Sequence, residues 1–489
     1  MKTEFFPVIG LEIHVQLNTL SKLFCPCSTA YIGTVPNTNI CPVCLGLPGT
    51  LPVLNGKVVE YSVITALALN CRINRATRFH RKNYFYPDLP KAYQISQYDL
   101  PVGEDGYIYI RGEGGDMKRI GIIRLHLEED AGKLVHSAAD GRLAGASASY
   151  VDYNRAGVPL AEIVSAPDLS SPSEAKEYVS LLRQLVRYLG VSDGDMEKGS
   201  MRVDANISVK CSDGRWGDRS EIKNMNSLRA LERALSFEIK RQTAILEEGG
   251  TVLQETRHWN DSEGRTISSR SKEEAHDYRY FPEPDLPPLF LPEGFVEEME
   301  QTLPEMPWVR KSRFIRDYSL SETDVAVITE SPDLADLFER CVREGASSER
   351  SANWIRTEVL RVVNERKTSV GDLPLSSHVL AQLLSMIDSG KLSNTAAKEV
   401  FDCIIETGAG VEEALKVCNL QSGGISGSQL VEIIRDILEK NSSVVETIRS
   451  GEDGNGKKSK FLQGLVMRET RGQADPEEVR MLLQELIES

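Results

Sequence analysis

Residues 7–17 read Pro-Val-Ile-Gly-Leu-Glu-Ile-His-Val-Gln-Leu, and from Ile9 onward apolar and polar side chains alternate. Successive side chains of a strand point to opposite faces of a sheet, so this stretch predicts a half-buried strand with Glu12 and His14 on its polar face. The stretch 201–210, Met-Arg-Val-Asp-Ala-Asn-Ile-Ser-Val-Lys, alternates in the same way. Together they predict a sheet with an apolar core side and a polar working side.

Further elements surround these two strands. Strand-like runs cover 119–128 and 148–154. A helix is expected over 171–189, because it starts with serine, proline and a glutamate of the capping-box type and is followed by a glycine. A second helix is expected over 227–248, before a Gly-Gly pair. The chain therefore mixes strands and helices up to residue 290.

The clearest domain boundary is the segment 281–292, which contains five prolines. Proline lacks a backbone donor and interrupts helices and most sheet pairing. The pattern beyond it is almost entirely helical. The sequence thus predicts an α+β protein: a domain with a mixed or antiparallel sheet over 1–292, an all-α helical linker domain over 293–406, and a small α-helical tail module over 407–489.

Four cysteines form two close pairs, Cys25-Pro-Cys27 and Cys41-Pro-Val-Cys44. Four thiolates close a tetrahedral structural zinc site and leave no open position for catalysis. Prolines inside the pairs and glycines just after them are typical of zinc-knuckle turns. The alternatives are four reduced, buried thiols or a disulfide.

The composition is that of an ordinary globular protein, with 40% hydrophobic and 26% charged residues. Charged residues interrupt the amino-terminal stretch, and no uncharged apolar run approaches the ~18 residues of a membrane span, so we expect a cytoplasmic protein. The formal net charge of −15 disfavours wholesale wrapping of nucleic acid. Any contact with RNA must be focal.

Several carboxylates and one imidazole recur on the predicted polar faces. Hard oxygen ligands that converge from several strands are what a magnesium-dependent phosphoryl-transfer site needs. Each acid, taken alone, is also compatible with a solvated surface position. The chain has no GxxxxGK[ST] loop and no GxGxxG spacing, so no phosphate-loop motif indicates nucleotide binding. The catalytic candidates are Glu12, His14, Glu128, Glu129, Glu162 and Asp204.

Three other runs, 81–88, 223–226 and 277–284, mix cations or amides with aromatic side chains. Such mixtures suit phosphate, ribose or base contacts, although surface loops with packed tyrosines give the same pattern. The candidates for substrate or ATP binding are Lys82, Tyr84, Lys223, Asn224, Tyr278 and Arg279.

Eight blocks in register resemble the B-subunit family of the glutamyl-/aspartyl-tRNA amidotransferases. They are GLEIHVQL (10–17), the CxC and CPVCLGLPG elements (25–49), RKNYFYPDLPKAYQISQYD (81–99), RLHLEEDAGK (124–133), LAEIVSAPD (160–168), SMRVDANIS (200–208), EIKNMNS (221–227) and DYRYFPEPDLPPL (277–289). The segments 391–401 and 461–483 resemble the family's mobile C-terminal module. The length leaves no room for the inserted domain of a related archaeal subunit, so the resemblance indicates the bacterial or organellar three-subunit type.

The resemblance implies a cradle-like catalytic domain and a heterotrimer with an amidase (A) subunit and a small C subunit. The amidase releases ammonia from glutamine, and the B subunit uses ATP and Mg²⁺ to phosphorylate the side-chain carboxylate of misacylated Glu-tRNA(Gln) or Asp-tRNA(Asn). Ammonia then displaces phosphate. Which tRNA is used depends on the synthetases of the cell.

The resemblance also implies residue roles. Magnesium would be held by His14, Glu129, Glu162 and Asp204, with Glu12 beside them and zinc in the cysteine site. Strict alternation places Glu128 on the polar face, whereas the resemblance implies Glu129. A bulge at the strand end would reconcile the alternation with the resemblance. A basic cluster in the tail is expected to contact the outside of the tRNA, with a solvated helix face as the alternative: Lys457, Lys458, Lys460, Arg468 and Arg471.

Two rival functions come from other classes. One is a stand-alone ATP-dependent amide ligase acting on a small acid, which needs neither tRNA nor partners. The other is a non-enzymatic zinc-knuckle RNA-binding scaffold, which cleaves no ATP. Carboxylates on several strands disfavour the scaffold, and the helical tail disfavours the small-substrate ligase.

Overall fold

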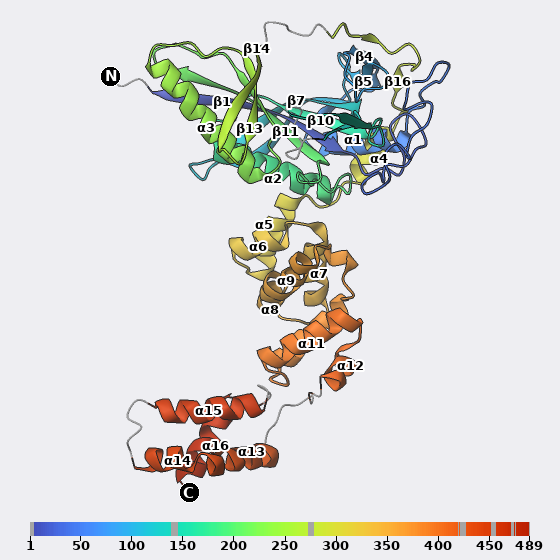
Figure 1. Cartoon of the computed structure of the whole chain (residues 1–489). Coiled ribbons are helices and arrows are strands. Elements are labelled where there is room, and N and C mark those ends of the chain that lie inside the picture. Colours follow the sequence, from blue (N-terminus) through green and yellow to red (C-terminus); the bar gives the residue numbers. More distant parts are fainter. Residues whose placement is uncertain are drawn as a thin grey trace. The chain divides into compact units, whose positions relative to one another are not determined.

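The computed structural model describes residues 4–137, 145–271, 278–418, 420, 427–450, 456–470, 474 and 476–488. The chain divides into two compact units, Met1–Met306 and Pro307–Ser489 (Figure 1). The first holds all sixteen described strands and the second is helical. The predicted α+β class, a sheet domain followed by helices, is confirmed.

The first unit is built on a twelve-stranded mixed sheet with the order β14-β13-β12-β11-β1-β10-β7-β5-β4-β15, in which β6 also pairs with β7 and β2. Of its ladders, β12 with β13 is parallel and the others are antiparallel. The strands are β1 (Phe5–Gln16), β2 (Arg72–Ile73), β4 (Phe79–Asn83), β5 (Tyr93–Gln97), β6 (Gly103–Arg111), β7 (Met117–Glu129), β10 (Pro159–Ser165), β11 (Met201–Cys211), β12 (Ser220–Lys223), β13 (Glu255–Asn260), β14 (Arg265–Ser271) and β15 (Phe281–Pro282).

The alternation seen in the sequence sets the two faces of this sheet. Ile13, Ile163 and Val203 lie on one face and are buried. The helices α2 (Pro172–Tyr188) and α3 (Leu228–Glu247) pack against each other, with α2 contacting β6 and α3 contacting β11 and β14 (Figure 1). Both begin where expected, because Ser171 and Ser227 cap their first turns. The opposite face keeps the polar side chains.

A β-bulge in β7 changes the phase of its alternation. Ser165 pairs with Ile122 whereas Val164 pairs with Arg124, so Ile123 is an extra residue opposite β10. Buried apolar positions shift from Ile120 and Ile122 before the bulge to Leu125 and Leu127 after it. Beyond the bulge the even-numbered side chains of β7 therefore share the polar face with those of β1.

The proline-rich segment is part of the first unit. Its first residues form β15 and pair with β4, and its later residues form β16 (Leu289–Phe290), which pairs with β3 (Ala76–Thr77). Two helices, α1 (Gly56–Ala68) and α4 (Phe295–Gln301), and the hairpin of β8 (Lys133–His136) and β9 (Ser149–Asp152) complete the unit. The segment interrupts regular structure, as its prolines predict, but the unit extends beyond it.

The second unit contains two separate apolar cores. The first runs from Phe314 to Leu420, past the expected boundary at residue 406, and the second from Leu430 to Ile487. The first core is formed by α5 (Pro307–Tyr318), α6 (Glu322–Ile328), α7 (Pro332–Arg343), α8 (Ser348–Trp354), the π-helical turn Ile355–Val359, α9 (Leu360–Arg366), the short 3₁₀ turn Val370–Asp372, α10 (Ser377–Asp388), α11 (Asn394–Thr407) and α12 (Val411–Val417). The second is formed by α13 (Gly427–Lys440), α14 (Ser442–Arg449), α15 (Lys457–Glu469) and α16 (Pro476–Glu488).

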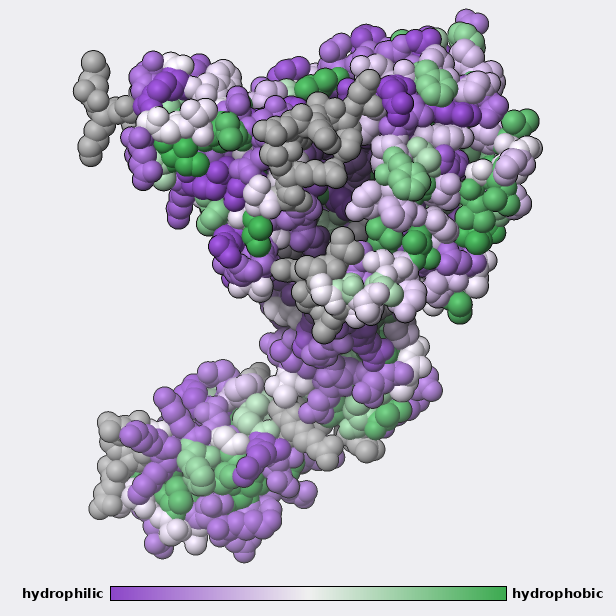
Figure 2. All heavy atoms as spheres, turned by 45° about the horizontal axis from the view of Figure 1, so that its top comes forward, coloured by the Kyte–Doolittle hydropathy of each residue, from purple (hydrophilic) through white to green (hydrophobic). Residues whose placement is uncertain are grey.

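Hydrophilic side chains cover most of the visible face of the protein, and the N-terminal unit is hollowed there (Figure 2). Among the described helices, none has the length and apolar character needed to cross a bilayer.

Candidate functional site

Three side chains from three neighbouring strands meet on the polar face of the sheet. Nε2 of His14 on β1 lies 3.4 Å from a carboxylate oxygen of Glu128 on β7 and 3.4 Å from one of Glu162 on β10. Cross-strand pairing explains the meeting, because His14 is directly opposite Glu162, which is directly opposite His126. Nε2 of His126 approaches Glu162 to 3.1 Å. We call His14, Glu128 and Glu162 the carboxylate cluster.

The charged groups of the carboxylate cluster shift one another's pKa values. Burial alone lowers the pKa of His14, but hydrogen bonds to the two glutamates outweigh burial and raise this pKa to about 10. Burial raises the pKa of Glu128, but the hydrogen bond and charge of His14 bring it below its ordinary value. For Glu162, burial is outweighed by His126 and His14, and the pKa lies well below the ordinary value. Two ionised carboxylates that stabilise an imidazolium also suit a divalent cation.

The cluster has the dimensions of a cation site. One ligand atom from each of His14, Glu128 and Glu162 lies within 4.8 Å of the others. Two carboxylate oxygens and one imidazole nitrogen leave several coordination positions for water or phosphate, as Mg²⁺ requires. The set therefore fits an open, catalytic type of metal site.

Glu129 lies on the other face of β7. Its carboxylate accepts a hydrogen bond of 2.9 Å from the backbone N–H of Ile95 and forms an ion pair with Lys91. The bulge of β7 is at Ile123, and β7 and β10 stay in register from Arg124 to Glu129. The strand-end bulge that would bring Glu129 to the cluster is absent from this pairing, and Glu128 rather than Glu129 lies beside His14 and Glu162.

Glu12 and Asp204 lie opposite each other on β1 and β11, next to the cluster on the polar face. Glu12 accepts a hydrogen bond of 2.9 Å from Asn206. Asp204 accepts one of 2.6 Å from Nζ of Lys223, which also lies 3.1 Å from Glu221. Neither acid joins the group of ligand atoms around His14 among the described residues. They form the adjoining rim of the same site.

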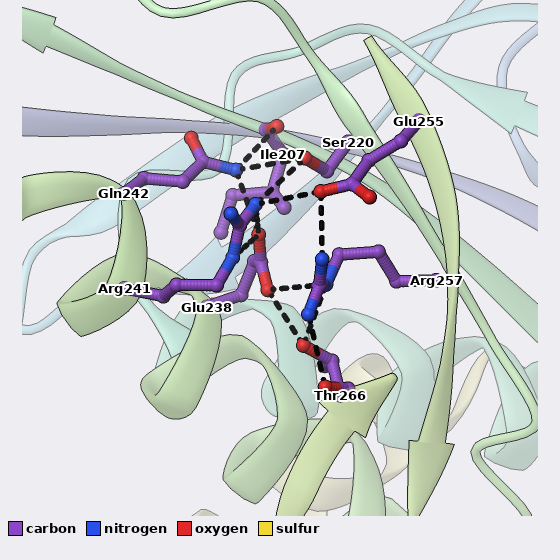
Figure 3. Close-up of polar contacts among 8 residues, drawn as sticks. All are labelled: Ile207, Ser220, Glu238, Arg241, Gln242, Glu255, Arg257 and Thr266. Atoms are coloured by element: carbon purple, nitrogen blue, oxygen red, sulfur yellow. Dashed lines mark hydrogen bonds and ion pairs between the residues drawn. The ribbon is translucent and has the colours of Figure 1, made fainter. Parts of the chain in front are cut away.

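A buried polar network fixes the edge of the sheet that carries Lys223 (Figure 3). The fully buried carboxylate of Glu238 on α3 accepts hydrogen bonds from Arg241, Gln242 and Thr266. Arg241 and Gln242 in turn each lie 3.3 Å from Oγ of Ser220 on β12. These contacts join Glu238 and its neighbours on α3 to Ser220 of β12 and Thr266 of β14, so they hold both strands against the helix.

The remaining substrate-binding candidates divide into two places. Nζ of Lys82 lies 5.0 Å from the ring centre of Tyr278 and 5.9 Å from that of Tyr84. Burial lowers the pKa of Lys82, but the charge of Glu128 outweighs it and raises this pKa, which places Lys82 beside the cluster. Arg279 is exposed, and its carbonyl oxygen accepts a hydrogen bond from Asn83.

Asn224 is placed by backbone geometry. It follows β12 with a φ of 70°, and its side chain donates a hydrogen bond of 3.0 Å to the carbonyl oxygen of Trp259 on β13. This contact spans the parallel ladder and fixes the turn after Lys223. The residue lines a shallow cavity with Arg202, Asp204 and Lys223 on the polar face.

Several polar residues of this face were not among the candidates chosen from the sequence. Asp130 is buried and accepts hydrogen bonds of 2.6 Å from Arg202 and 2.9 Å from Gln16. The side chain of Arg124 makes no ion pair or hydrogen bond within the part of the chain that the structure describes, although its Nε is buried. On this face three other buried nitrogens have no partner among the described residues: His80 Nδ1, His126 Nδ1 and Arg202 Nε. Alternation along β7 and β11 already places Arg124, His126 and Arg202 on this face, but it does not distinguish them from solvated surface side chains.

The unpartnered Nε atoms of Arg124 and Arg202 are buried donors, and they indicate an anionic or acceptor-rich ligand on this face. Buried donors are rarely left without a partner in a native protein, because an unmade hydrogen bond is costly. His80 and Arg124 flank the carboxylate cluster from β4 and β7. The face therefore combines ligands for a divalent cation with cations and donors for phosphate or carboxylate oxygens.

The four predicted cysteines come together. One sulfur atom from each of Cys25, Cys27, Cys41 and Cys44 lies within 4.8 Å of the others, and all nine cysteines of the chain are free of disulfides. We call these four the cysteine clip. The hydrogen bond from Cys25 is the main reason that the pKa of Cys44 falls to about 5. Cys25 and Cys44 of the clip line one cavity of about 170 Å³ together with Lys91 and Glu129.

In the tail, four of the five basic candidates belong to α15. Lys457, Lys460 and Arg468 are exposed, and Lys458 is half-buried. Phe461 is exposed on the same helix. Arg471 lies outside the described residues. Three exposed cations with an aromatic ring form the kind of surface that contacts an RNA backbone.

Two family models match the chain. One, described as the GatB/GatE catalytic domain, matches residues 7–297, and the other, described as the GatB domain, matches 336–487. A protein of Caldanaerobacter subterraneus subsp. tengcongensis, named as the B subunit of aspartyl/glutamyl-tRNA(Asn/Gln) amidotransferase, is 50% identical over 479 residues, 98% of each chain. Proteins of the same name from Carboxydothermus hydrogenoformans and Thermotoga maritima are each 48% identical, over 98–99% of their lengths.

Proposed function

Because the chain belongs to the family of aspartyl/glutamyl-tRNA(Asn/Gln) amidotransferase B subunits, we propose that it amidates misacylated tRNA. Its substrates are Glu-tRNA(Gln), Asp-tRNA(Asn) or both, and its products are Gln-tRNA(Gln) and Asn-tRNA(Asn). The activity requires ATP, Mg²⁺ and ammonia from an amidase (A) subunit, in a heterotrimer with a small C subunit. The carboxylate cluster is the observation that carries the proposal.

The chemistry explains the need for ATP. The side-chain carboxylate of the aminoacyl group is a poor acylating agent, so one of its oxygens first attacks the γ-phosphorus of ATP and ADP leaves. Ammonia then attacks the acyl carbon, phosphate leaves, and the amide loses a proton. Mg²⁺ bound at the cluster would neutralise charge on the phosphate oxygens.

The residues of the polar face divide these tasks. His14, Glu128 and Glu162 would hold the ion, and Glu12 and Asp204 form the adjoining rim of the site. Lys82 and Arg124 carry positive charge beside the cluster without an ion pair to a described carboxylate, and they are suited to bind phosphate or substrate oxygens. Lys223, positioned by Asp204 and Glu221, approaches from the other side. Excluding water protects the acyl phosphate from hydrolysis.

The rival functions receive less support. A scaffold that only binds RNA has no use for two buried, ionised glutamates around an imidazole. A small-acid ligase has no use for a separate helical tail. The relatives are named for a tRNA substrate, and they match this chain over nearly its full length.

A reconstituted complex tests the proposal. With ammonium chloride in place of glutamine, we expect ATP cleavage and amidation that require misacylated tRNA and Mg²⁺. Glu128→Gln should abolish both reactions while binding to the amidase partner persists, and Glu129→Gln serves as the adjacent control with a retained metal requirement. Amidation by Glu128→Gln at the wild-type rate would contradict the placement of the site.

The tail is proposed to bind the outside of the tRNA. Deleting residues from 427 onward removes a helical module with its own apolar core, so we expect the KM for aminoacyl-tRNA to rise at least about tenfold, in line with lost phosphate contacts. The glutaminase activity of the complex should stay nearly intact. Loss of complex assembly would instead show that the tail is structural.

The cysteine clip is proposed to hold one structural zinc ion. Four cysteines are a usual ligand set for a structural zinc ion, and they leave no coordination position for substrate. Metal analysis of protein purified under reducing, chelator-free conditions should find about one zinc per chain.

A further inference from the structure

Lys22 is a buried cation beside the cysteine clip. It is the one buried lysine among the described residues, with 0% of its surface exposed. Its Nζ donates hydrogen bonds to the carbonyl oxygen of Asn39 at 3.0 Å and to Sγ of Cys44 at 3.8 Å. No carboxylate of the described chain forms an ion pair with it. Of the two atoms that accept hydrogen bonds from Lys22 Nζ, the sulfur of Cys44 is the one that can carry a full negative charge.

An ammonium group without a counter-charge is strongly disfavoured in a protein interior. Two less buried lysines of this unit have such a partner: Lys91 pairs with Glu129, and Lys118 pairs with Glu174. Lys22 departs from this pattern unless the clip itself is anionic. The burial of Lys22 therefore indicates negative charge on the sulfur atoms of the clip. This indication is independent of the spacing of the cysteines.

A zinc centre supplies that charge. Four thiolates around Zn²⁺ leave two negative charges uncompensated. The clip is partly buried, since Cys25 and Cys44 are almost inaccessible, so this excess is poorly screened by water. Cys44 accepts a second hydrogen bond, 3.2 Å long, from the backbone N–H of Cys41. The cation and the amide both converge on one sulfur.

The position of Lys22 is fixed by the backbone around it. Its N–H donates to the carbonyl oxygen of Cys27, and the N–H of Leu23 donates to that of Gly157, both at 2.9 Å. Gly157 has a φ of +85°, and a Cβ there would lie 3.5 Å from both Lys22 Cδ and Cys44 Cβ. The aliphatic stem is therefore confined, and the ammonium group is held at the sulfur.

We propose that Lys22 is the built-in counter-charge of the zinc–thiolate centre and slows metal release through its contact with Cys44. The inference rests on the zinc site proposed above. It assigns to Lys22 a positioning and charge-balancing role, distinct from metal ligation.

The test measures zinc release from the full chain to the chromophoric chelator 4-(2-pyridylazo)resorcinol. Lys22→Met keeps the length of the stem and removes the charge, and we expect release at least about tenfold faster than from wild type, the scale seen when support of a metal ligand is lost. Lys22→Gln, which keeps a donor without the charge, should behave like Lys22→Met. The matched control is Lys57→Met, an exposed lysine paired with Glu60, which should release zinc at the wild-type rate.

Charge balance is separated from packing by a double-variant cycle. Cys41→His replaces a thiolate by a neutral ligand, so the effect of Lys22→Met should shrink in that background. Equal effects in both backgrounds, or an unchanged release rate with a lowered melting temperature, would overturn the counter-charge role. Wild-type protein without metal would overturn the zinc site itself, and the stoichiometry measured first distinguishes that failure from the others.

Discussion

The carboxylate cluster and the cysteine clip are two groups of possible metal ligands in one unit, and they are built in opposite ways. The clip brings four soft sulfur atoms together from twenty consecutive residues, the number that would fill a tetrahedral zinc site. The cluster takes its three ligands from β1, β7 and β10, which are far apart in the sequence, and leaves positions open. Local ligands form a site that stabilises a loop, whereas ligands from several strands form a site that can hold a substrate.

The sharpest way to break this comparison is to remove a ligand from the cluster. We expect His14→Ala, Glu162→Ala and Asp204→Ala each to reduce tRNA-dependent amidation and ATP cleavage by about 10³-fold or more, the scale of losing preorganised charge stabilisation. These side chains lie on the polar face, so no core cavity opens. Circular dichroism and pull-down with the amidase partner should show that each variant is still folded and still binds that partner. Unchanged amidation in two of the three would place the site elsewhere.

Metal removal distinguishes the two sites by their kinetics. Brief treatment with EDTA should stop ATP cleavage at once, and added Mg²⁺ should restore it fully, because Mg²⁺ exchanges readily from oxygen ligands. The zinc content should be unchanged over the same interval. Simultaneous loss of zinc and activity, with no recovery in Mg²⁺ alone, would show that the two sites are not independent.

A smaller effect on activity is expected at the clip. Cys41→Ser removes one thiolate, and since structural zinc contributes folding energy, the melting temperature should fall by more than about 5 °C. Amidation measured well below that temperature should stay within about threefold of wild type, because no ligand of the cluster is touched. A loss of activity without a loss of stability would give the clip a catalytic role.

The smallest effect concerns pH and the framework of the cluster. Burial raises the pKa of Asp130, but the charges of Arg202 and Arg155 outweigh burial and hold it below the ordinary value. The ion pair therefore stabilises the fold at pH values above the unfolded pKa, and this stabilisation is lost as the pH falls through the folded pKa. Asp130→Asn should cost about 1.5–3 kcal/mol at pH 7. Denaturant unfolding should show that the difference from wild type shrinks below about pH 4.

The sequence predicted what depends on local pattern. The cysteine spacing located the clip, and alternation over 7–17 and 201–210 placed His14 and Asp204 on the polar face, where the structure has them. The helix caps at Ser171 and Ser227 were also readable, because a cap is a contact within one turn. These features need no knowledge of which strands become neighbours.

What escaped prediction depends on contacts between distant segments. The choice between Glu128 and Glu129 required the position of a bulge that only the pairing of β7 with β10 defines. Glu238 occupies a position on an amphipathic helix that resembles any surface glutamate, yet it is fully buried beside Arg241 of its own helix and Arg257 of β13. Lys22 likewise has no distinguishing feature in the sequence, and only the folded structure shows that it is buried.

The two adjacent acids at the end of β7 point to opposite faces of the sheet, so the contacts of both depend on the register of this strand. Glu128 serves the polar face and Glu129 pairs with Lys91 on the other, one backbone step away. Losing or gaining one residue between the bulge and Glu128 would turn each acid to the wrong side and invert the buried leucines with them. Substitutions here can be mild, but changes in length are all-or-none.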